Sequence, residues 1–558
     1  SEHFAEMKDE EGLAKKFWIK FKSEPLFVIY SPFVISLAAD TLHSDCFLHF
    51  LSQDVRFYTA FAHAYELAEE CADDDDDKSA IRKLRKRVLE KLKVHDNDVR
   101  EWGFELPKES SLDNATVKYT NFLLATASGK VEGEKGKIAT PFEKTKIAAY
   151  TVGAVAPFMR LYTFISKEIL GILNHNEQSH AYKKWMDSYS SQEFEESAIQ
   201  TELALDKLSI SLTGEELDII EKLYHQALKL EADFFTSQSI NQQIVVPLSR
   251  AHPACCQLSM FCDFDLTCTA YDSAAILAEI AIVTAQKAGP QSSESQITRM
   301  SSADLRNTWG VLSNQYTEEY EQTIESIMPT KRVAKFDHEA LRKALEQLLD
   351  FEKTANSRVI NSGVLKGINM EEIKRAGQQL IFQDGCKEFF KKIVNDEKLK
   401  TDVHILSYCW CGDLIKSALS SGGLDALQVH SNELAYIESI TTGEIIEKMG
   451  SPMEKLQTFS EILNRQSRPE NHLTVYIGGT VGDLLCLLEA DIGIVMGSSA
   501  SLRALGYQFG VSFVPLFSGV VKKQIELNGN GSCPWKKLSG SLYTVSSWAE
   551  IHAFILGL

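Results

Sequence analysis

The chain has 558 residues and a formal net charge of −19, from 58 Lys and Arg against 77 Asp and Glu. At roughly 150 residues per domain this length excludes a single small domain, and a content of 44% hydrophobic and 24% charged residues excludes a disordered or fibrous chain. The acidic excess repels phosphate backbones and anionic lipids, so we expect neither nucleic acid nor a membrane as a partner.

The cysteines and the start of the chain bear on its location. The 11 cysteines are odd in number and lack a paired framework, which favours a reducing compartment. The first residues, Ser1 to Phe4, resemble neither a secretory signal nor an Arg-rich transit peptide. We therefore expect a cytoplasmic protein, with a mitochondrial form if a presequence is missing from this chain.

Residues 11–240 have apolar side chains at intervals of three and four. One such series is Phe47, Phe50, Leu51, Phe57 and Phe61, and this spacing is typical of helices that bury one face. The connections between such runs are polar or contain glycine. The pattern predicts an all-helical bundle that forms a domain over residues 1–245.

Two acids lie on apolar faces of the predicted helices. Asp54 shares its face with Phe50 and Phe57, and Glu231 shares its face with Phe234. A carboxyl group turned toward a core needs a hydrogen bond or a raised pKa, and both conditions suit acid/base chemistry. The pattern alone leaves open a purely structural role, in which a tyrosine or a backbone group satisfies each acid.

The same half resembles the TenA family in three segments, which are Gln53 to Tyr58, Tyr182 to Tyr189 and Ala227 to Phe235. This resemblance implies an all-helical, haem-oxygenase-like fold. It also implies binding of the aminopyrimidines of thiamine salvage and hydrolytic removal of an amino or formylamino group. By the same resemblance, the pocket residues are Asp54, Tyr119, Tyr162 and Tyr189, and the catalytic carboxylate is Glu231.

One departure from that family concerns the nucleophile. Members of one branch carry a cysteine after the proline of the central helix, whereas this chain has Phe158 after Pro157. The resemblance then implies the mechanism of the branch without cysteine. In that mechanism Glu231 provides the acid/base group and water is the nucleophile.

From about residue 254 onward, short β-rich runs alternate with helical segments. The runs are Leu258 to Cys262, Val403 to Leu406, Leu473 to Ile477, Ile492 to Val495 and Ser512 to Val514. This alternation predicts an α/β, Rossmann-like domain over residues 254–558 with a parallel sheet and crossover helices. The helical stretch between the first two runs is too long for a loop, so we expect an inserted cap at about residues 270–400.

An apolar strand ends in Asp263 and Asp265, whose spacing puts both side chains on one side of an extended backbone. Such a pair suits phosphoryl transfer, because one carboxylate can attack phosphorus while the other protonates the leaving oxygen. The anionic reactants also need cations, such as a lysine and a magnesium ion. Ser407, Lys455 and Asp483 follow later strands, near the edge where open α/β sheets bind ligands.

In this order the motifs resemble those of the haloacid dehalogenase (HAD) superfamily. The resemblance implies that Asp263 is the nucleophile, Asp265 the acid/base group, and Ser407 and Lys455 the groups that stabilise the phosphate. It also implies Mg²⁺ as cofactor, held by Asp263, the backbone carbonyl of Asp265 and Asp483. Thr267 is expected to support the turn after the strand. Where many members carry a further acid, four positions before Asp483, this chain has Gly479.

The order of the two halves resembles a family of plant bifunctional thiamine monophosphate phosphatases. This implies hydrolysis of thiamine monophosphate to thiamine and phosphate through an aspartyl phosphate, beside aminopyrimidine salvage. An alternative is a pyrimidine nucleotidase or broad phosphatase whose helical half is a non-catalytic binding or oligomerisation module. In the phosphatase domain, four residues of the cap are candidates to face the substrate pocket, and they are Tyr271, Asp272, Trp309 and Tyr316. The apolar faces of the bundle favour a homo-oligomer.

Overall fold

A computed structural model describes residues 12–131, 144–173, 179–251, 257–288, 299–465, 472–527, 534–535 and 540–558. Ser1 to Phe4, used above to predict location, lie outside this part of the chain. The chain forms two compact units, one of residues 1–247 with 520–527 and 557–558, the other of residues 248–519 and 528–556. In the described ranges, every helix is too short or too polar to cross a bilayer.

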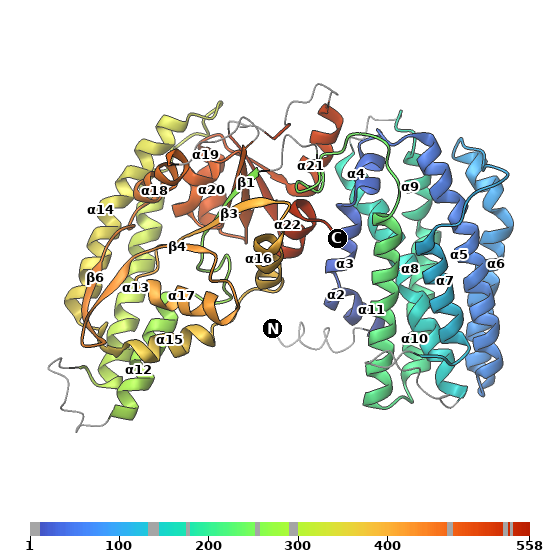
Figure 1. Cartoon of the computed structure of the whole chain (residues 1–558), viewed down its shortest axis with the longest axis horizontal. Helices are drawn as coiled ribbons and strands as arrows, with labels where there is room; N and C mark the ends of the chain where they lie inside the picture. Colours follow the sequence, from blue (N-terminus) through green and yellow to red (C-terminus); the bar gives the residue numbers. More distant parts are fainter. Residues whose placement is uncertain are drawn as a thin grey trace. The chain divides into compact units, whose positions relative to one another are not determined.

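The first unit is helical throughout its described residues, and its long helices α5, α7, α8 and α11 pack side by side (Figure 1). Its helices are α2 (Leu13–Lys20), α3 (Ser23–Ile29), α4 (Pro32–Ala38), α5 (Ser44–Cys71), α6 (Asp75–Glu101), α7 (Asn114–Ala127), α8 (Lys144–Ile172), α9 (Lys183–Tyr189), α10 (Gln192–Ser209) and α11 (Gly214–Thr236).

Local sequence explains where the functional helices begin and which face they bury. Helix α11 begins at a capping box, in which Thr213 and Glu216 satisfy each other's backbone amides. Its buried face contains Glu231 between apolar residues, and the buried face of α5 contains Asp54 in the same way. The amphipathic pattern therefore turns both acids into the core of the bundle.

The second unit is built on a seven-stranded parallel sheet with the order β4-β3-β1-β7-β8-β10-β9. The strands are β1 (Gln257–Cys262), β3 (Lys400–Leu406), β4 (Gln428–His430), β7 (His472–Gly478), β8 (Ile492–Met496), β9 (Ser512–Pro515) and β10 (Ser541–Val545). All five predicted strands are present, and the α/β fold class is confirmed. The sequence analysis missed β4 and β10.

Strand β1 lies in the interior of the sheet and pairs with β3 on one side and β7 on the other. Residues that follow these three strands therefore meet at one edge of the sheet. The helices that follow β1 in the chain are α12 (Ser273–Ala288), α13 (Ser302–Ile327), α14 (His338–Ser362), α15 (Met370–Gln378), α16 (Cys386–Asn395), α17 (Gly412–Ser421), α18 (Pro452–Asn464), α19 (Leu484–Glu489), α20 (Ala500–Gln508), α21 (Leu516–Glu526) and α22 (Trp548–Ile555).

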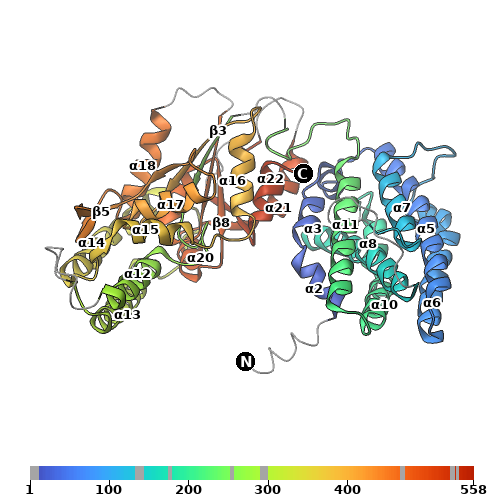
Figure 2. The same ribbon diagram turned by 60° about the horizontal axis from the view of Figure 1, so that its bottom comes forward.

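The cap is composed of two insertions instead of the single one expected. Helices α12 to α15 lie between β1 and β3, and they are seen together in Figure 2. Strands β5 (Glu433–Ile437) and β6 (Ile440–Ile446) lie between β4 and α18, and they form an antiparallel sheet with β2 (Lys366–Asn369). Helix α16 packs on β3 and α22, so it belongs to the core domain although the predicted cap range of 270–400 included it.

Two glycines within cap helices provide a test of this packing. A Cβ atom added at Gly377 would lie 2.7 Å from the carbonyl oxygen of Leu414 in α17, whereas one at Gly310 meets nothing within 4 Å. We expect Gly377→Ala to lower the free energy of unfolding by about 1–3 kcal/mol, because overpacking forces backbone shifts. Gly310→Ala should raise it by about 0.5–1 kcal/mol, because alanine restricts the unfolded chain. Urea unfolding of both variants checks this, and shifts of the same sign would contradict it.

Candidate active sites

The first candidate site begins where β1 ends. Asp263 follows the last residue of β1 and is buried, and its backbone N–H donates to the carbonyl of Ile477 in β7 at 2.9 Å. The chain then turns through Leu266, whose φ of 61° lies in the left-handed region. The hydroxyl of Thr269 accepts a hydrogen bond from the N–H of Leu266 at 3.1 Å. Thr269 thus supports the turn, whereas the hydroxyl of Thr267 has no partner among the described residues, which corrects the expectation for Thr267.

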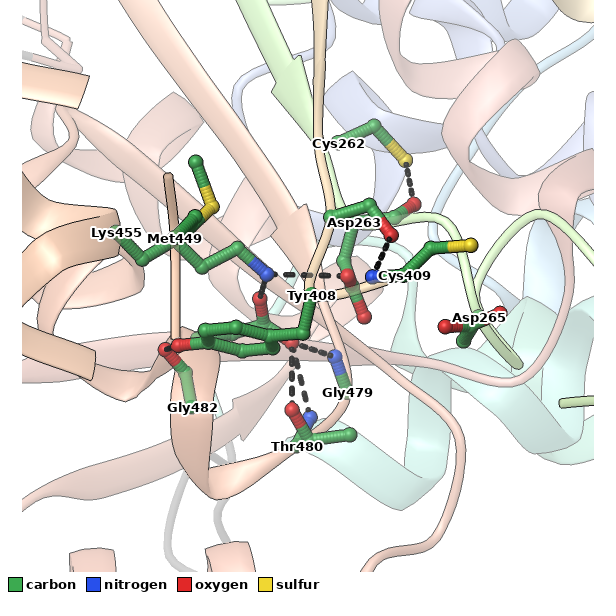
Figure 3. A network of polar contacts seen from close by, with 12 residues as sticks. Cys262, Asp263, Asp265, Tyr408, Cys409, Met449, Lys455, Gly479, Thr480 and Gly482 are labelled. Carbon is green, nitrogen blue, oxygen red and sulfur yellow. Dashed lines mark hydrogen bonds and ion pairs between the residues drawn. The ribbon is translucent and has the colours of Figure 1, made fainter. Parts of the chain in front are cut away.

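Lys455 joins two acids that are far apart in the sequence, and Figure 3 shows its contact with the first of them, Asp263. Its Nζ lies 3.0 Å from Oδ1 of Asp263 and 2.7 Å from Oδ1 of Asp483, and its side chain is fully buried. Burial acts to lower the pKa of Lys455, but the two carboxylates hold this pKa above its ordinary value. The charged ammonium group can therefore compensate the negative charge of a nucleophile and a phosphate that approach each other.

Asp483 is held by a dense set of hydrogen bonds. Besides Lys455, its Oδ1 accepts from the hydroxyl of Tyr476 at 2.7 Å. Its Oδ2 accepts from the N–H of Gly479 and from both the N–H and the hydroxyl of Thr480, each at 3.1 Å. Burial alone would raise the pKa of Asp483, whereas Lys455 and these donors keep it below its ordinary value. Since a carboxylate has about four lone-pair sites, Asp483 has no free site for a metal in this arrangement.

The metal ligands predicted from the sequence are thus only partly free. A Cβ atom at Gly479 would lie 2.3 Å from the carbonyl oxygen of Met496 in β8, so an acid does not fit there without movement of the loop. In the described residues, no group of three or more His, Cys, Asp or Glu is placed to hold a metal ion. The second carboxylate oxygen of Asp263 and the backbone carbonyl of Asp265 fit Mg²⁺ only together with substrate phosphate and water.

Asp265 is oriented by a residue that sequence analysis missed. Ser273, at the start of α12, donates to the two carboxylate oxygens of Asp265 through its N–H and its hydroxyl, each at 2.9 Å. Burial and then the charge of Asp272 raise the pKa of Asp265 to about 7. A group with this pKa can give and take a proton near neutral pH.

Ser407 lies directly after β3, as predicted, and is buried. Its backbone N–H donates to the carbonyl of His430 at 2.9 Å, and its hydroxyl accepts from the N–H of Cys409 at 3.0 Å. These contacts fix the loop after β3 at the same edge of the sheet as Asp263. The hydroxyl of Ser407 can therefore donate a hydrogen bond to an acceptor that enters the site.

The second candidate site lies in the helical unit. It brings together the five predicted residues from five helices, Asp54 from α5, Tyr119 from α7, Tyr162 from α8, Tyr189 from α9 and Glu231 from α11, all of them buried. The hydroxyl of Tyr119 donates to Oε1 of Glu231 at 3.2 Å, and the rings of Tyr162 and Tyr189 lie 5.2 Å apart. The tertiary structure thus assembles acids and aromatic rings around one point of the core.

Several buried polar atoms of this site have no hydrogen-bond partner in the described part of the chain. They are both carboxylate oxygens of Asp54, the hydroxyl of Tyr162 and Oε2 of Glu231. Buried polar groups in folded proteins are nearly always paired, so these atoms are suited to a polar ligand. Carboxyl groups and hydroxyls offer the donors and acceptors that an aminopyrimidine requires.

Lys91 is a further residue of this site that sequence analysis missed. Its Nζ lies 4.3 Å from the ring centroids of Tyr189 and Phe194. Burial lowers the pKa of Lys91 to about 8, although the charge of Asp54 opposes this. The residue was overlooked because it lies on α6, whose sequence is rich in Lys and Arg and is typical of a solvated face.

Phe158 occupies the position at which the cysteine-bearing branch has its nucleophile. Its ring stacks on Tyr162 with centroids 4.4 Å apart and meets the edge of Phe61 at 4.8 Å. An aromatic side chain therefore fills this part of the wall. Glu231, which is buried, therefore stays the acid/base candidate of this site.

The buried carboxyl group of Asp54 should lower the free energy of unfolding at neutral and alkaline pH. Burial raises its pKa to about 8, whereas in an unfolded chain the pKa is about 4. Between these values the folded state binds one more proton than the unfolded state, so stability falls as pH rises. We expect Asp54→Asn to stabilise the protein more at pH 8 than at pH 5, by up to about 4 kcal/mol, because each pH unit between the two pKa values costs about 1.4 kcal/mol.

Thermal unfolding at both pH values measures this effect. Asp96→Asn is the matched control, because Asp96 is an exposed acid on α6. An equal change at pH 5 and pH 8, or the same change in the control, would show that Asp54 is ionised in the folded state.

Comparisons with known proteins found a family model that matches the helical unit. Residues 24–132 and 142–241 match the model of the TENA/THI-4/PQQC family, and these ranges include all five residues of the helical site. An aminopyrimidine aminohydrolase of Staphylococcus saprophyticus is 23% identical over 231 residues, which are 40% of this chain and 93% of that protein.

Two further similarities extend beyond the helical unit. The chain is 60% identical over 554 residues to a protein of Arabidopsis thaliana named bifunctional TH2 protein, mitochondrial, with 98% of this chain and 90% of that protein covered. A solved structure described as a phospho-aspartyl intermediate analogue of phosphoserine phosphatase is 18% identical, with a TM-score of 0.27, and covers 44% of this chain and 88% of that chain.

Proposed function

This chain belongs to the family of the bifunctional TH2 protein, and from that premise we propose that its second unit hydrolyses thiamine monophosphate to thiamine and phosphate. The chain combines a TenA-type helical unit with a parallel α/β unit in which Asp263, Lys455 and Asp483 meet at the strand ends. The observation that carries the proposal is the buried contact of Lys455 with Asp263, the residue after β1. That pairing neutralises a nucleophile that must approach an anionic ester.

The proposed reaction has two steps. A carboxylate oxygen of Asp263 attacks phosphorus and the bond from phosphorus to the ester oxygen breaks, while Asp265 gives its proton to that oxygen. Water then attacks phosphorus of the aspartyl phosphate and Asp265 takes its proton, which releases phosphate and restores both acids. Ser273 holds the carboxylate of Asp265 in one orientation during these steps, and Ser407 donates to a phosphate oxygen.

Magnesium is part of the proposal with a reduced set of protein ligands. Asp263 and the backbone carbonyl of Asp265 would hold the ion together with the substrate phosphate, and the ion would supply charge compensation. Asp483 would join them only if it released hydrogen bonds. We therefore expect weaker retention of the metal than a site with two free carboxylates would show.

We propose that the helical unit hydrolyses amino- or formylamino-pyrimidines. Asp54 and the tyrosines bind the heterocycle, and Glu231 moves protons between water and the leaving nitrogen. The hydrogen bond from Tyr119 leaves one oxygen of Glu231 available for this task. A non-catalytic binding or oligomerisation module is the competing function, and light scattering of the purified protein tests the predicted homo-oligomer.

The phosphatase proposal is tested by phosphate release from thiamine monophosphate and from a pyrimidine nucleotide, each with magnesium and with EDTA. Much faster, metal-dependent release from thiamine monophosphate supports it. Similar rates for both esters would favour the nucleotidase or broad phosphatase. We still predict a cytoplasmic protein, although the name of the Arabidopsis thaliana relative includes the word mitochondrial. Fractionation of cells tests this prediction.

A further inference from the structure

The cap contains a group of aromatic side chains, one of which stacks on the loop after β3. On α13, Tyr316 and Tyr320 stack with centroids 5.8 Å apart, and Phe351 of α14 lies 5.3 Å from Tyr316. Trp309 of α13 stacks on Trp410, which follows Ser407 by three residues, at 5.9 Å. These five residues are called the cap aromatic cluster below. They are only partly buried, and Tyr316 is 39% exposed, so their rings are accessible to a ligand.

Glu352 of α14 adds a negative charge to the cluster. Its Oε1 accepts a hydrogen bond from the hydroxyl of Tyr316 at 2.9 Å. Among the described residues, no Lys, Arg or His forms an ion pair with Glu352. Burial and then the charge of Glu447 raise its pKa to about 7. A carboxyl group in such surroundings gains most from a ligand that brings a positive charge.

The cluster lies next to the phosphatase site. The ring of Tyr408 lies 4.3 Å from Nζ of Lys455, and Tyr408 is adjacent to Ser407 in the chain. The charges of Asp483, Asp263 and Glu352 all contribute to a raised pKa of Tyr408, after its burial. Burial, and then the charges of Glu352 and Asp483, also raise the pKa of Tyr320. Tyr320, Phe351 and Tyr408 also pack against one apolar core cluster, so the cap aromatic residues and the loop after β3 lie in one region.

The polar groups of the cluster fit a nitrogen heterocycle better than an aliphatic chain. Nε1 of Trp309 is buried and has no hydrogen-bond partner among the described residues, whereas Nε1 of Trp410 donates to Asn356 at 3.1 Å. A flat ring with an acceptor nitrogen could use the first donor while it stacks on the indoles. An aliphatic chain would leave the aromatic faces without a stacking partner, and one that lacks an acceptor atom would leave the indole donor unused.

We infer that the cap aromatic cluster and Glu352 bind the leaving group of the phosphate ester and select a flat heterocycle that carries a positive charge. The faces of aromatic rings attract cations, and the carboxylate of Glu352 adds a direct charge interaction. The neutral base of a pyrimidine nucleotide obtains stacking but not this electrostatic attraction. The inference rests on the proposed phosphatase function and narrows its substrate class.

The test compares two esters that differ in charge alone. One is thiamine monophosphate, and the other is its neutral isostere, in which carbon replaces the quaternary nitrogen of the thiazolium ring. We expect Glu352→Gln to raise KM for the cationic ester about tenfold with little change in kcat. The neutral isostere and p-nitrophenyl phosphate should be unaffected. Glu346→Gln is the matched control, since Glu346 is an exposed acid on the same helix.

Two outcomes would overturn the inference. One is an unchanged KM for the cationic ester in Glu352→Gln, and the other is an equal loss for both esters. Glu352→Asp, which keeps the charge, should retain part of the selectivity, and equal thermal midpoints of the variants exclude misfolding.

Failure of the proposed function gives a different result. If thiamine monophosphate is not hydrolysed, thiamine and its neutral isostere are compared as ligands by quenching of tryptophan fluorescence. Tighter binding of the cation, lost in Glu352→Gln, would support the cap site although the proposed reaction had failed. Equal binding of the two compounds would overturn the cap site itself.

Discussion

Asp263→Asn is expected to lower phosphate release from thiamine monophosphate by at least about 10³-fold. The amide cannot attack phosphorus as a carboxylate does, so no aspartyl phosphate forms. The effect should lie almost wholly in kcat, because Ser407 and Lys455 remain to bind the phosphate.

The substitution should leave the fold intact. Lys455 keeps its second partner, Asp483, at 2.7 Å, so the buried ammonium group is not left without a countercharge. Thermal unfolding should therefore show a stable protein, and aminopyrimidine hydrolysis by the helical unit should be unchanged.

Asp425→Asn is the matched control, because Asp425 is an exposed acid of the same unit. Its rate of phosphate release should equal that of the unmodified protein. Residual release by Asp263→Asn above a hundredth of the normal rate would exclude Asp263 as the nucleophile, and Asp265 would then be examined in the same way.

Glu231→Gln is expected to lower aminopyrimidine hydrolysis by about 10²–10⁴-fold. The carboxyl group is buried, its burial raises its pKa well above the ordinary value, and one of its oxygens is free of protein partners. The amide preserves the shape and the hydrogen bond from Tyr119 but cannot take up or release the proton. Ammonia release from an aminopyrimidine measures the effect.

Glu215→Gln is the control for this prediction, since Glu215 is exposed in the first turn of the same helix. Phosphate release should be normal in both variants, in contrast to Asp263→Asn. Unchanged hydrolysis in Glu231→Gln would support the competing view that the helical unit only binds ligands or mediates self-association.

These variants also separate the two units functionally. Each removes a carboxylate from one unit, and the activity of the other unit serves as an internal control for protein concentration and folding. A loss of both activities in either single variant would show that the sites depend on each other, which the bifunctional proposal does not require.

The sequence was sufficient for features that depend on neighbouring residues. The spacing of apolar residues around Asp54 and Glu231 fixes which helical face is buried, so both acids were placed in the core of the bundle. The apolar run before Asp263 marks a buried strand, and the parallel order of such strands brings their ends together. Fold class and the positions of these acids follow from local signals, whereas the roles of the candidate residues came from the resemblance to known families.

Only the tertiary structure decided how distant side chains meet. Lys455 contacts Asp263 across 192 residues of sequence, and Asp483 is occupied by Lys455, Tyr476 and the loop at Gly479. Lys91 beside Tyr189, Ser273 beside Asp265 and Glu352 among the cap aromatic residues were equally hidden. Periodicity determines the element and the face of a residue, but its partner depends on how the elements pack, and no local pattern records that.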